Sequence, residues 1–476
     1  MRKYTRKSNP WQLRIGERRA LLLFGDFVMG LISLVIALVY WGSTVRFIAF
    51  DQEFLRTRVP FWFYFLPIIW LIFLIELYDI HRAGDWKRTV RSIAFAALIG
   101  LVLYAALYFY YVDPPTSLLP RRGVAAFILA VSVLTLLWRG IYIRIFTAPQ
   151  FMRRVLLVGG GKTGEIMLQI VNDLRPQPFF LAGIVDDDPQ KNGIEIEGMK
   201  VIGTSEHLLE VIDEYRVSDI IVAISGEMRG SMFQALLDAQ EHGVEISRMP
   251  VVYEELLDRV PIRLLEADWI LRSFVDQARV NGFFELAKRM VDIAAGLVGS
   301  FINLLILPFI GIAIFIDDGL PIFYSQIRSG RGGQPYKIFK FRTMRRDAEA
   351  DGRPQWAKED DKRATRVGLL LRKTHIDEIP QFLNVLRGDM SLVGPRAERP
   401  ELVEHFQKHV PFYRARHLVK PGITGWAQIN YGYASTIDET ITKLEYDLYY
   451  IKHRSLIMDM IIFLRTPSTI LGLRGR

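Results

Sequence analysis

The chain has no cysteine in its 476 residues. This absence excludes disulfide bonds, thiolate nucleophiles and cysteine-ligated zinc or iron–sulfur sites, so any bound metal must be held by oxygen or imidazole ligands. A hard cation such as Mg2+ is therefore the favoured metal. The sequence also has no evident internal repeat or low-complexity tract.

Hydrophobic residues make up 50% of the sequence and the mean hydropathy is +0.18, although 23% of the residues are charged. The apolar residues must therefore be concentrated in runs, and the length predicts several domains. The net charge of +9 suits nucleic acid, anionic lipid or phosphorylated small substrates. The apolar runs favour the last two and argue against nucleic acid.

Four early apolar stretches have about the length of a membrane-spanning helix. They are Leu21–Trp41, Phe61–Leu77, Thr89–Tyr111 and Gly123–Tyr142. Basic residues precede the first stretch and follow the second and fourth, which predicts that both ends of a four-helix bundle face the cytoplasm. The first stretch lacks a cleavage site and is expected to be retained. No role is assigned to Asp26 within it.

From Arg154 onward the pattern alternates between strands and helices, which predicts a small, doubly wound, Rossmann-like α/β domain over residues 151–260. Its first turn has the spacing of a dinucleotide-binding fingerprint. The residues concerned are Gly159, Gly161, Gly164 and Asp186. Such glycines also serve close packing, so ligand binding and architecture both stay open. We interpret the domain as regulatory, nucleotide-sensing or oligomerising, with a homodimer as one alternative.

A further apolar segment, Ile293–Ile316, contains no charged residue. Basic residues flank both of its ends, so both ends favour the same side of a membrane. Pro308 lies inside the segment and bends a helix there, because proline cannot donate a backbone hydrogen bond and clashes with the preceding turn. We predict a re-entrant helix–break–helix over residues 288–316; the alternative is a kinked spanning helix.

Two adjacent acids, Asp377 and Glu378, precede a predicted helix that has Pro380 in its first turn. Partial positive charge at a helix N-terminus favours ionised carboxylates and anionic substrates. One carboxylate of such a pair can attack a phosphorus atom while the other holds a metal or steers protons.

Three sequence blocks carry a resemblance to a known family: GLPIFYSQIRSGRGGQPYKIFKFRTM, RVGLLLRKTHIDEIPQFLNVLRGDMSLVGPRAE and HLVKPGITGWAQIN. They closely resemble the bacterial polyprenyl-phosphate hexose-1-phosphate transferases, the monotopic phosphoglycosyl transferases. The whole chain resembles the long form of that family, with an N-terminal four-helix membrane bundle.

The resemblance implies a membrane α-helical bundle, a Rossmann-like α/β domain and a mixed α/β catalytic domain with a re-entrant membrane helix. The expected parts are a basic cytoplasmic tail (1–20), four transmembrane helices (21–146), the α/β domain (151–260), a linker (261–283) and the catalytic domain (284–476).

The resemblance also implies a reaction at the bacterial inner membrane, with the catalytic domain facing the cytoplasm. A hexose-1-phosphate passes from a UDP-hexose to undecaprenyl phosphate, giving UMP and the first lipid-linked product of exopolysaccharide, capsule or O-antigen synthesis. Asp377 would be the nucleophile that forms an aspartyl phosphosugar, and Glu378 its partner. Both would hold the Mg2+ that bridges the diphosphate.

Basic residues of the same blocks complete the expected site. Lys340, Arg342 and Arg396 match motifs expected to bind the substrate phosphates, because positive charge stabilises the leaving nucleotide. Lys288 and Arg289 match a basic pair that either binds the lipid phosphate or anchors the helix at the membrane interface. Ala397 replaces a proline that is usual in the family, which predicts a less rigid turn beside Arg396.

Two other readings stay open. A nucleotide-sugar dehydratase would explain the glycine-rich turn, and Tyr336 with Lys340 has its Tyr-x-x-x-Lys spacing, although the pair lies far along the chain from that turn. A membrane-anchored nucleotide sensor or scaffold would need no catalytic residues, and the surroundings of Asp377 argue against it.

Overall fold

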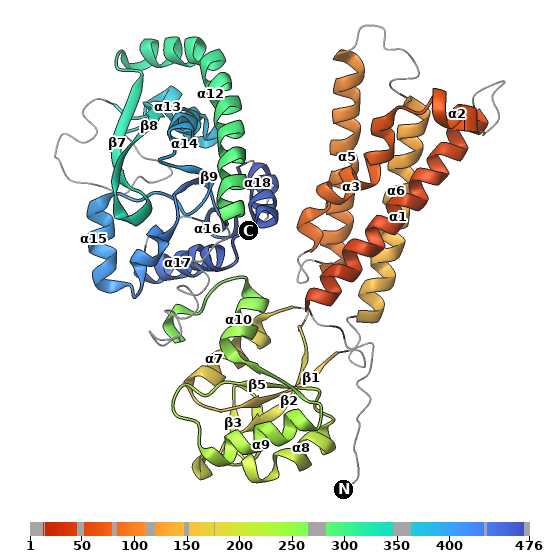
Figure 1. Cartoon of the computed structure of the whole chain (residues 1–476), viewed down its shortest axis with the longest axis vertical. Coiled ribbons are helices and arrows are strands. Elements are labelled where there is room, and N and C mark those ends of the chain that lie inside the picture. The colour runs from red at the N-terminus through yellow and green to blue at the C-terminus, as the bar shows by residue number, and fades with distance from the viewer. Residues whose placement is uncertain are drawn as a thin grey trace. The chain divides into compact units, whose positions relative to one another are not determined.

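The computed structural model describes residues 13, 15–44, 52–78, 83–110, 120–146, 152–175, 177–264, 282–345, 363–432 and 436–470. The chain divides into two compact units, Met1–Leu256 and Leu257–Arg476 (Figure 1). Most of the predicted basic tail and of the predicted linker lies outside the described residues.

Long apolar helices dominate the first part of the chain (Figure 1). They are α1 (Ile15–Thr44), α5 (Trp86–Tyr110) and α6 (Arg121–Phe146). Each contains a span that is long and apolar enough to cross a membrane, and so does α12 (Gly282–Asp318) of the second unit. These four helices mark the chain as a membrane protein.

The second predicted stretch differs from the expectation of a full spanning helix. It forms a 3-10 helix η1 (Phe61–Phe65), a short α3 (Leu66–Phe73) and a further 3-10 turn η2 (Ile75–Tyr78). Pro67 lies at the start of α3 and has no backbone N–H to continue the hydrogen-bond ladder from the preceding turn. The apolar run is therefore divided into pieces shorter than a membrane span.

A buried ion pair joins the first and last helices of the bundle. An Nη atom of Arg139 on α6 lies 2.6 Å from a carboxylate oxygen of Asp26 on α1, and neither side chain is exposed. Arg139 also donates a hydrogen bond to the carbonyl of Leu77 at 3.0 Å. The acid inside the first helix is thus paired, as an acid inside a bilayer needs to be.

The α/β domain contains a six-stranded sheet in the order β3-β4-β2-β1-β5-β6. The strands are β1 (Arg154–Val158), β2 (Phe180–Val185), β3 (Glu195–Ile196), β4 (Met199–Gly203), β5 (Asp219–Val222) and β6 (Glu245–Arg248). All pairings are parallel except that of β3 with β4. The predicted doubly wound fold is confirmed. The strand order reverses at β1, and β1 leads into the glycine-rich turn and α7 (Lys162–Asp173).

The second unit combines short strands with many short helices (Figure 1). Its elements include the antiparallel hairpin of β7 (Phe323–Ser329) and β8 (Pro335–Phe341), α13 (Arg366–Thr374), η8 (Ile376–Gln381), α14 (Phe382–Arg387), β9 (Ser391–Val393), α15 (Pro400–His409), η9 (Tyr413–Leu418), β10 (Gly422–Thr424), α16 (Trp426–Asn430), α17 (Ile437–Lys452) and α18 (Leu456–Ile470). The strands β9 and β10 pair in parallel. Buried side chains from α15, η9, α17 and α18 form the main core behind this pair.

The long helix α12 runs without interruption from Gly282 to Asp318, with Pro308 inside it. Figure 1 shows α12 bent into two limbs but still one helix, whereas we predicted two helices separated by a break. The re-entrant path through a membrane stays a prediction. The C-terminal end of α12 is held by the rest of the unit, because Arg342 donates to the carbonyls of Asp318 and Gly319 at 2.9 and 2.6 Å.

Glycines on α12 allow α14 to approach closely. A Cβ atom at Gly299 would lie 2.2 Å from Cγ of Phe382, and one at Gly296 would lie 2.8 Å from the side chain of Leu386. Helix α14 directly continues η8, which carries the two adjacent acids. The glycine contacts therefore connect the long apolar helix to the segment of the predicted site.

We expect Gly299→Ala to lower the stability of the second unit by about 1–3 kcal/mol, because the added methyl group overpacks a closed contact. The control is Gly282→Ala at the start of the same helix, where a Cβ atom would meet nothing within 4 Å. Thermal unfolding midpoints of the solubilised full chain measure both. Equal midpoints for the two variants would contradict this account of the α12–α14 contact.

Candidate functional site

Asp377 and Glu378 lie in the first turn of η8, directly after α13. His375 separates the two helices in a left-handed conformation with φ of 55°, which reverses the chain and begins η8. Only 7% of Asp377 and 9% of Glu378 is exposed. Two adjacent acids that are both buried require compensation, since burial disfavours the charged form of each.

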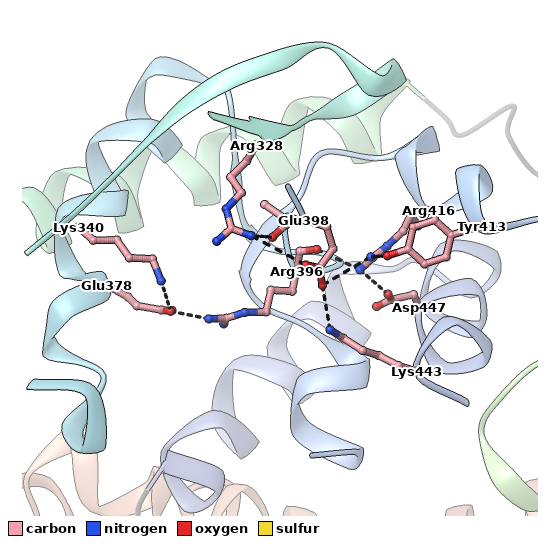
Figure 2. Close-up of polar contacts among 10 residues, drawn as sticks. Arg328, Lys340, Glu378, Arg396, Glu398, Tyr413, Arg416, Lys443 and Asp447 are labelled. Atoms are coloured by element: carbon pink, nitrogen blue, oxygen red, sulfur yellow. Dashed lines mark hydrogen bonds and ion pairs between the residues drawn. The ribbon is translucent and has the colours of Figure 1, made fainter. Parts of the chain in front are cut away.

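Glu378 receives that compensation from two cations. One of its carboxylate oxygens, Oε1, accepts hydrogen bonds from Lys340 at 2.7 Å and from Arg396 at 2.6 Å (Figure 2). Burial by itself would raise the pKa of Glu378, but Arg396 and Lys340 outweigh it and hold that pKa well below its usual value. Glu378 is therefore ionised at neutral pH.

Asp377 has a different environment from its neighbour. Burial raises the pKa of Asp377, although the charge of Lys340 partly opposes this effect. In the described parts of the chain no group donates a hydrogen bond to its carboxylate. The site thus holds one carboxylate that two cations bind and one that is left available for a ligand.

Arg396 lies just after β9 and is held from behind by a buried polar network (Figure 2). Its carbonyl accepts a hydrogen bond from Arg416 at 3.0 Å. Arg416 in turn donates to Asp447 at 2.8 Å and to the hydroxyl of Tyr413 at 2.6 Å. The position of the Arg396 guanidinium therefore depends on a second arginine.

Glu398 completes this network by pairing with Arg416 and with two further cations. It accepts a hydrogen bond from Lys443 at 3.1 Å, and it lies 3.8 and 3.9 Å from Arg416 and Arg328 (Figure 2). Burial alone would raise the pKa of Glu398, but Lys443, Arg416 and Arg328 lower it to about 2. Sequence reasoning missed Arg328, Arg416, Lys443 and Asp447 because none of them stands in an evident catalytic pattern.

The turn at Ala397 is well anchored, although it lacks the proline that is usual in the resembling family. The carbonyl of Ala397 accepts a hydrogen bond from Arg328 at 3.1 Å, and the carbonyl of Glu398 accepts one from the backbone of Ser329 at 2.9 Å. These bonds hold the segment to β7 and oppose the looseness that the sequence predicted.

Arg342, a predicted phosphate ligand, has protein partners other than Glu378. Its guanidinium binds the C-terminal end of α12 and lies 3.3 Å from the carboxylate of Asp318. The structure therefore brings together Lys340, Arg396 and Glu378 but leaves Arg342 in a different contact. Its phosphate-binding role stays a prediction.

Lys288 and Arg289, the pair predicted to bind the lipid phosphate, donate their hydrogen bonds to acceptors of the protein itself. Lys288 donates to the carbonyl of Val393, the hydroxyl of Tyr450 and the carboxylate of Asp459, at 3.1, 3.2 and 2.6 Å. These three bonds use all three of its donors. Arg289 donates to the last carbonyls of α14, those of Val385 and Leu386, at 2.8 and 2.7 Å. The lipid role of this pair stays a prediction.

Tyr336 and Lys340 do not form the dyad of a dehydratase. Both lie on β8, but the ammonium group of Lys340 is engaged by Glu378. The hydroxyl of Tyr336 is buried and has no hydrogen-bond partner in the described structure.

The glycine-rich turn of the α/β domain is closed by its own residues. Gly159 has φ of +102°, a backbone conformation that favours glycine. A Cβ atom at Gly164 would lie 2.1 Å from the Gly159 carbonyl oxygen, so this position needs glycine for close packing. The backbone N–H of Gly160 donates to Asp186 at 2.7 Å, and Lys191 binds the same carboxylate oxygen at 3.1 Å. Gly161 has open space around it. Ligand binding by this turn stays a prediction.

A Mg2+ ion fits the donor chemistry of the site. Among the described residues no three His, Cys, Asp or Glu side chains converge as a complete metal cage. Mg2+ is commonly bound by only one or two carboxylates together with substrate phosphates. Asp377 offers a carboxylate that no donor in the described parts of the chain binds, and Glu378 offers its second oxygen.

The sequence matches known proteins over most of its length. Residues 283–472 match the family described as "Bacterial sugar transferase", and residues 74–250 match the family described as "CoA-binding domain". A sugar transferase of Bacillus subtilis, named as uncharacterized, is 37% identical over 190 residues, which are 40% of this chain and 90% of that protein. The chain belongs to the bacterial sugar transferase family.

Two longer relatives have names that describe a reaction. The UDP-N-acetylgalactosamine-undecaprenyl-phosphate N-acetylgalactosaminephosphotransferase of Aeromonas hydrophila is 37% identical over 48% of this chain and 53% of its own length. The UDP-glucose:undecaprenyl-phosphate glucose-1-phosphate transferase of Escherichia coli K12 is 32% identical over 66% of each chain. The matched part thus spans about half to two thirds of these relatives.

We expect Glu378→Gln to destabilise the second unit by about 3 kcal/mol at neutral pH, because it leaves Lys340 and Arg396 without their buried anion. The pKa of Glu378 is lowered from its ordinary 4.5, so this stabilisation is present above pH 4.5 and is lost as the pH falls further. Thermal unfolding midpoints at a series of pH values measure the difference between wild type and variant.

The matched control for this experiment is Glu404→Gln, which changes an exposed acid on α15 beyond the first turn of that helix. Its midpoint is expected to follow that of the wild type at every pH. A wild-type advantage over Glu378→Gln that grew with acidification would contradict the assigned ionisation of Glu378.

Proposed function

We propose that the chain is a phosphoglycosyl transferase that moves a hexose-1-phosphate from a UDP-hexose to undecaprenyl phosphate. One observation carries the proposal: an available buried carboxylate, Asp377, stands beside an anion, Glu378, that holds two cations at the site. The names of the relatives support the donor and acceptor classes.

In the first step a carboxylate oxygen of Asp377 attacks the β-phosphorus of the donor. A bond forms between that oxygen and phosphorus, the bond from phosphorus to the bridging oxygen breaks, and UMP leaves with the electron pair. The raised pKa of Asp377 makes its carboxylate a stronger base and hence a better nucleophile. Arg396 and Lys340 stabilise the negative charge that develops on the leaving phosphate.

In the second step a phosphate oxygen of the lipid attacks the phosphorus of the aspartyl phosphosugar. The bond to Asp377 breaks, the carboxylate is restored, and undecaprenyl-diphosphate-hexose is the product. Glu378 stays ionised throughout and holds Lys340 and Arg396 in place. The Arg416 network fixes the segment that carries Arg396, so the guanidinium needs little reordering when substrate binds.

A Mg2+ ion held by Asp377 and Glu378 would neutralise the donor diphosphate and act as a Lewis acid toward it. The two residues would also orient the donor relative to the attacking oxygen.

The same proposal includes the membrane arrangement. The bent helix α12 would enter and leave the inner membrane on one side, with the catalytic unit in the cytoplasm, because both of its flanks are basic. The product would begin the assembly of exopolysaccharide, capsule or O-antigen. The α/β domain would serve regulation, nucleotide sensing or assembly of a homodimer.

Asp377→Asn is expected to reduce UMP release by a factor on the order of 10³ or more, because an amide cannot form the covalent intermediate. The assay uses the solubilised full chain with undecaprenyl phosphate, Mg2+ and a panel of UDP-sugars. Asp438→Asn, at an exposed position of the same unit, is the control and should keep full activity. Continued turnover without the lipid, beyond the one UMP per enzyme that the first step releases, or release that survives in Asp377→Asn, would overturn the proposal.

Lys340→Gln is expected to move the acidic limb of the rate–pH profile to higher pH. Lys340 lowers the pKa of Asp377, so its removal raises that pKa further, and the ionised nucleophile is lost at a higher pH. The profile of kcat/KM against pH measures the change. An unchanged or lowered midpoint in a folded variant would contradict the coupling between Lys340 and Asp377.

A further inference from the structure

Asn384 is a fully buried polar residue that the transfer steps above do not use. It lies on α14, in the continuous η8–α14 segment that also carries Glu378. Its side-chain oxygen accepts a hydrogen bond from the backbone N–H of Phe339 at 3.3 Å, and its amino group donates to the carbonyl of Lys337 at 2.8 Å. The side chain therefore links α14 to the backbone of β8.

The two bonds of Asn384 have the pattern of a neighbouring strand. A residue on a parallel strand donates to the residue before its partner and accepts from the residue after it. The Asn384 amide does the same on either side of Ile338. Among the strands that the structure describes, β8 pairs only with β7, and an isolated hairpin is marginally stable. The amide takes the place of a third strand at the other edge of β8.

Asp389 fixes the direction in which the Asn384 amide faces. A carboxylate oxygen of Asp389 accepts a hydrogen bond from the amino group of Asn384 at 3.3 Å. A carboxylate has no hydrogen to donate, so a rotated amide would bring oxygens together and would also lose both bonds to β8. The backbone carbonyl of Asn384 accepts from the N–H groups of Gly388 and Asp389 at 3.0 and 3.1 Å, which holds this turn in place.

The register that Asn384 imposes on β8 decides where Lys340 points. Side chains alternate along a strand, so Ile338 and Lys340 lie on one face. Ile338 is buried with Val385 of α14, and Lys340 reaches Glu378 at 2.7 Å. A slip of one residue would turn Lys340 to the other face. Apolar contacts have no direction, whereas the two amide bonds exclude that slip.

We propose that Asn384 is a positioning residue for the transfer reaction and that it acts through Lys340. It ties β8 to α14, so the ammonium group of Lys340 already lies at Glu378 when the leaving phosphate acquires charge. This inference rests on the proposed function, in which Lys340 stabilises that charge. Asn384 itself makes and breaks no covalent bond.

The first test is kinetic. Asn384→Ala is expected to lower kcat for UMP release on the order of ten-fold with KM for the UDP-sugar nearly unchanged, because Lys340 acts on charge that develops only in the transition state. In the Lys340→Gln background the same substitution should lower kcat no further, because the group that it positions is already absent. The assay uses the solubilised full chain below the unfolding transition of every variant. A further loss of similar size in that background would overturn the proposal.

Two more variants separate positioning from stability. Val403→Ala, in the main core on α15, should lower the unfolding midpoint and keep the wild-type kcat. Asp389→Ala removes a partly exposed side chain and loosens the amide while both bonds to β8 remain possible, so the test stays decisive where Asn384→Ala does not fold. It should lower kcat by a smaller factor than Asn384→Ala. A wild-type kcat in Asp389→Ala would contradict the role of Asn384.

Unfolding midpoints test the same link without the reaction. Glu378→Gln should lower the midpoint about half as much in the Asn384→Ala background as in the wild type, because Lys340 no longer holds Glu378 closely there. Equal decreases in the two backgrounds would overturn the link between Asn384 and the Lys340–Glu378 pair. Absence of UMP release by the wild type with every donor would instead refute the proposed function and would leave this measurement valid.

Discussion

The arrangement of the site depends on the pairing of Glu378 with Lys340 and Arg396. A buried carboxylate with two charged donors on one oxygen fixes three segments at once: strand β8, the start of η8 and the turn after β9. Without Glu378 the two cations would repel each other in a partly desolvated place. With it, the positive charge needed for a leaving phosphate is in position before substrate arrives, and no residue that the structure describes donates a hydrogen bond to the adjacent Asp377.

The two carboxylates are adjacent in sequence, yet their environments separate them chemically. Burial acts on both, but only Glu378 receives hydrogen bonds that favour its charged form. A second carboxylate behind Arg396 is also held ionised by cations: Glu398 pairs with Arg416, Lys443 and Arg328. Two buried anions therefore organise the cations on either side of Arg396, and the rigidity of the site comes from charge pairing more than from regular secondary structure.

Sequence reasoning predicted the doubly wound domain well, because hydrophobic alternation is a local signal. The DEIPQ block is also a local signal, and it identified the two acids as candidates, whose roles stay a prediction. Sequence reasoning could identify Lys340, Arg396 and Arg342 as basic motif residues but not their acceptors; Arg342 binds the end of α12, and Lys288 has its three donors occupied. A sequence shows the type of a side chain and its spacing, whereas the partner of a long cation is set by the tertiary fold. The division of the second apolar stretch has a different origin: Pro67 is a local signal, but hydropathy alone does not register it.

The ion pair between Asp26 and Arg139 has a consequence for the biogenesis of the protein. Asp26 lies in α1, which leaves the ribosome before α6, the helix that carries Arg139. Until α6 is synthesised, α1 carries an uncompensated acid that is costly to place among lipid chains. The first helix can therefore reach its final position only together with the last, which makes completion of the bundle a cooperative event late in membrane insertion.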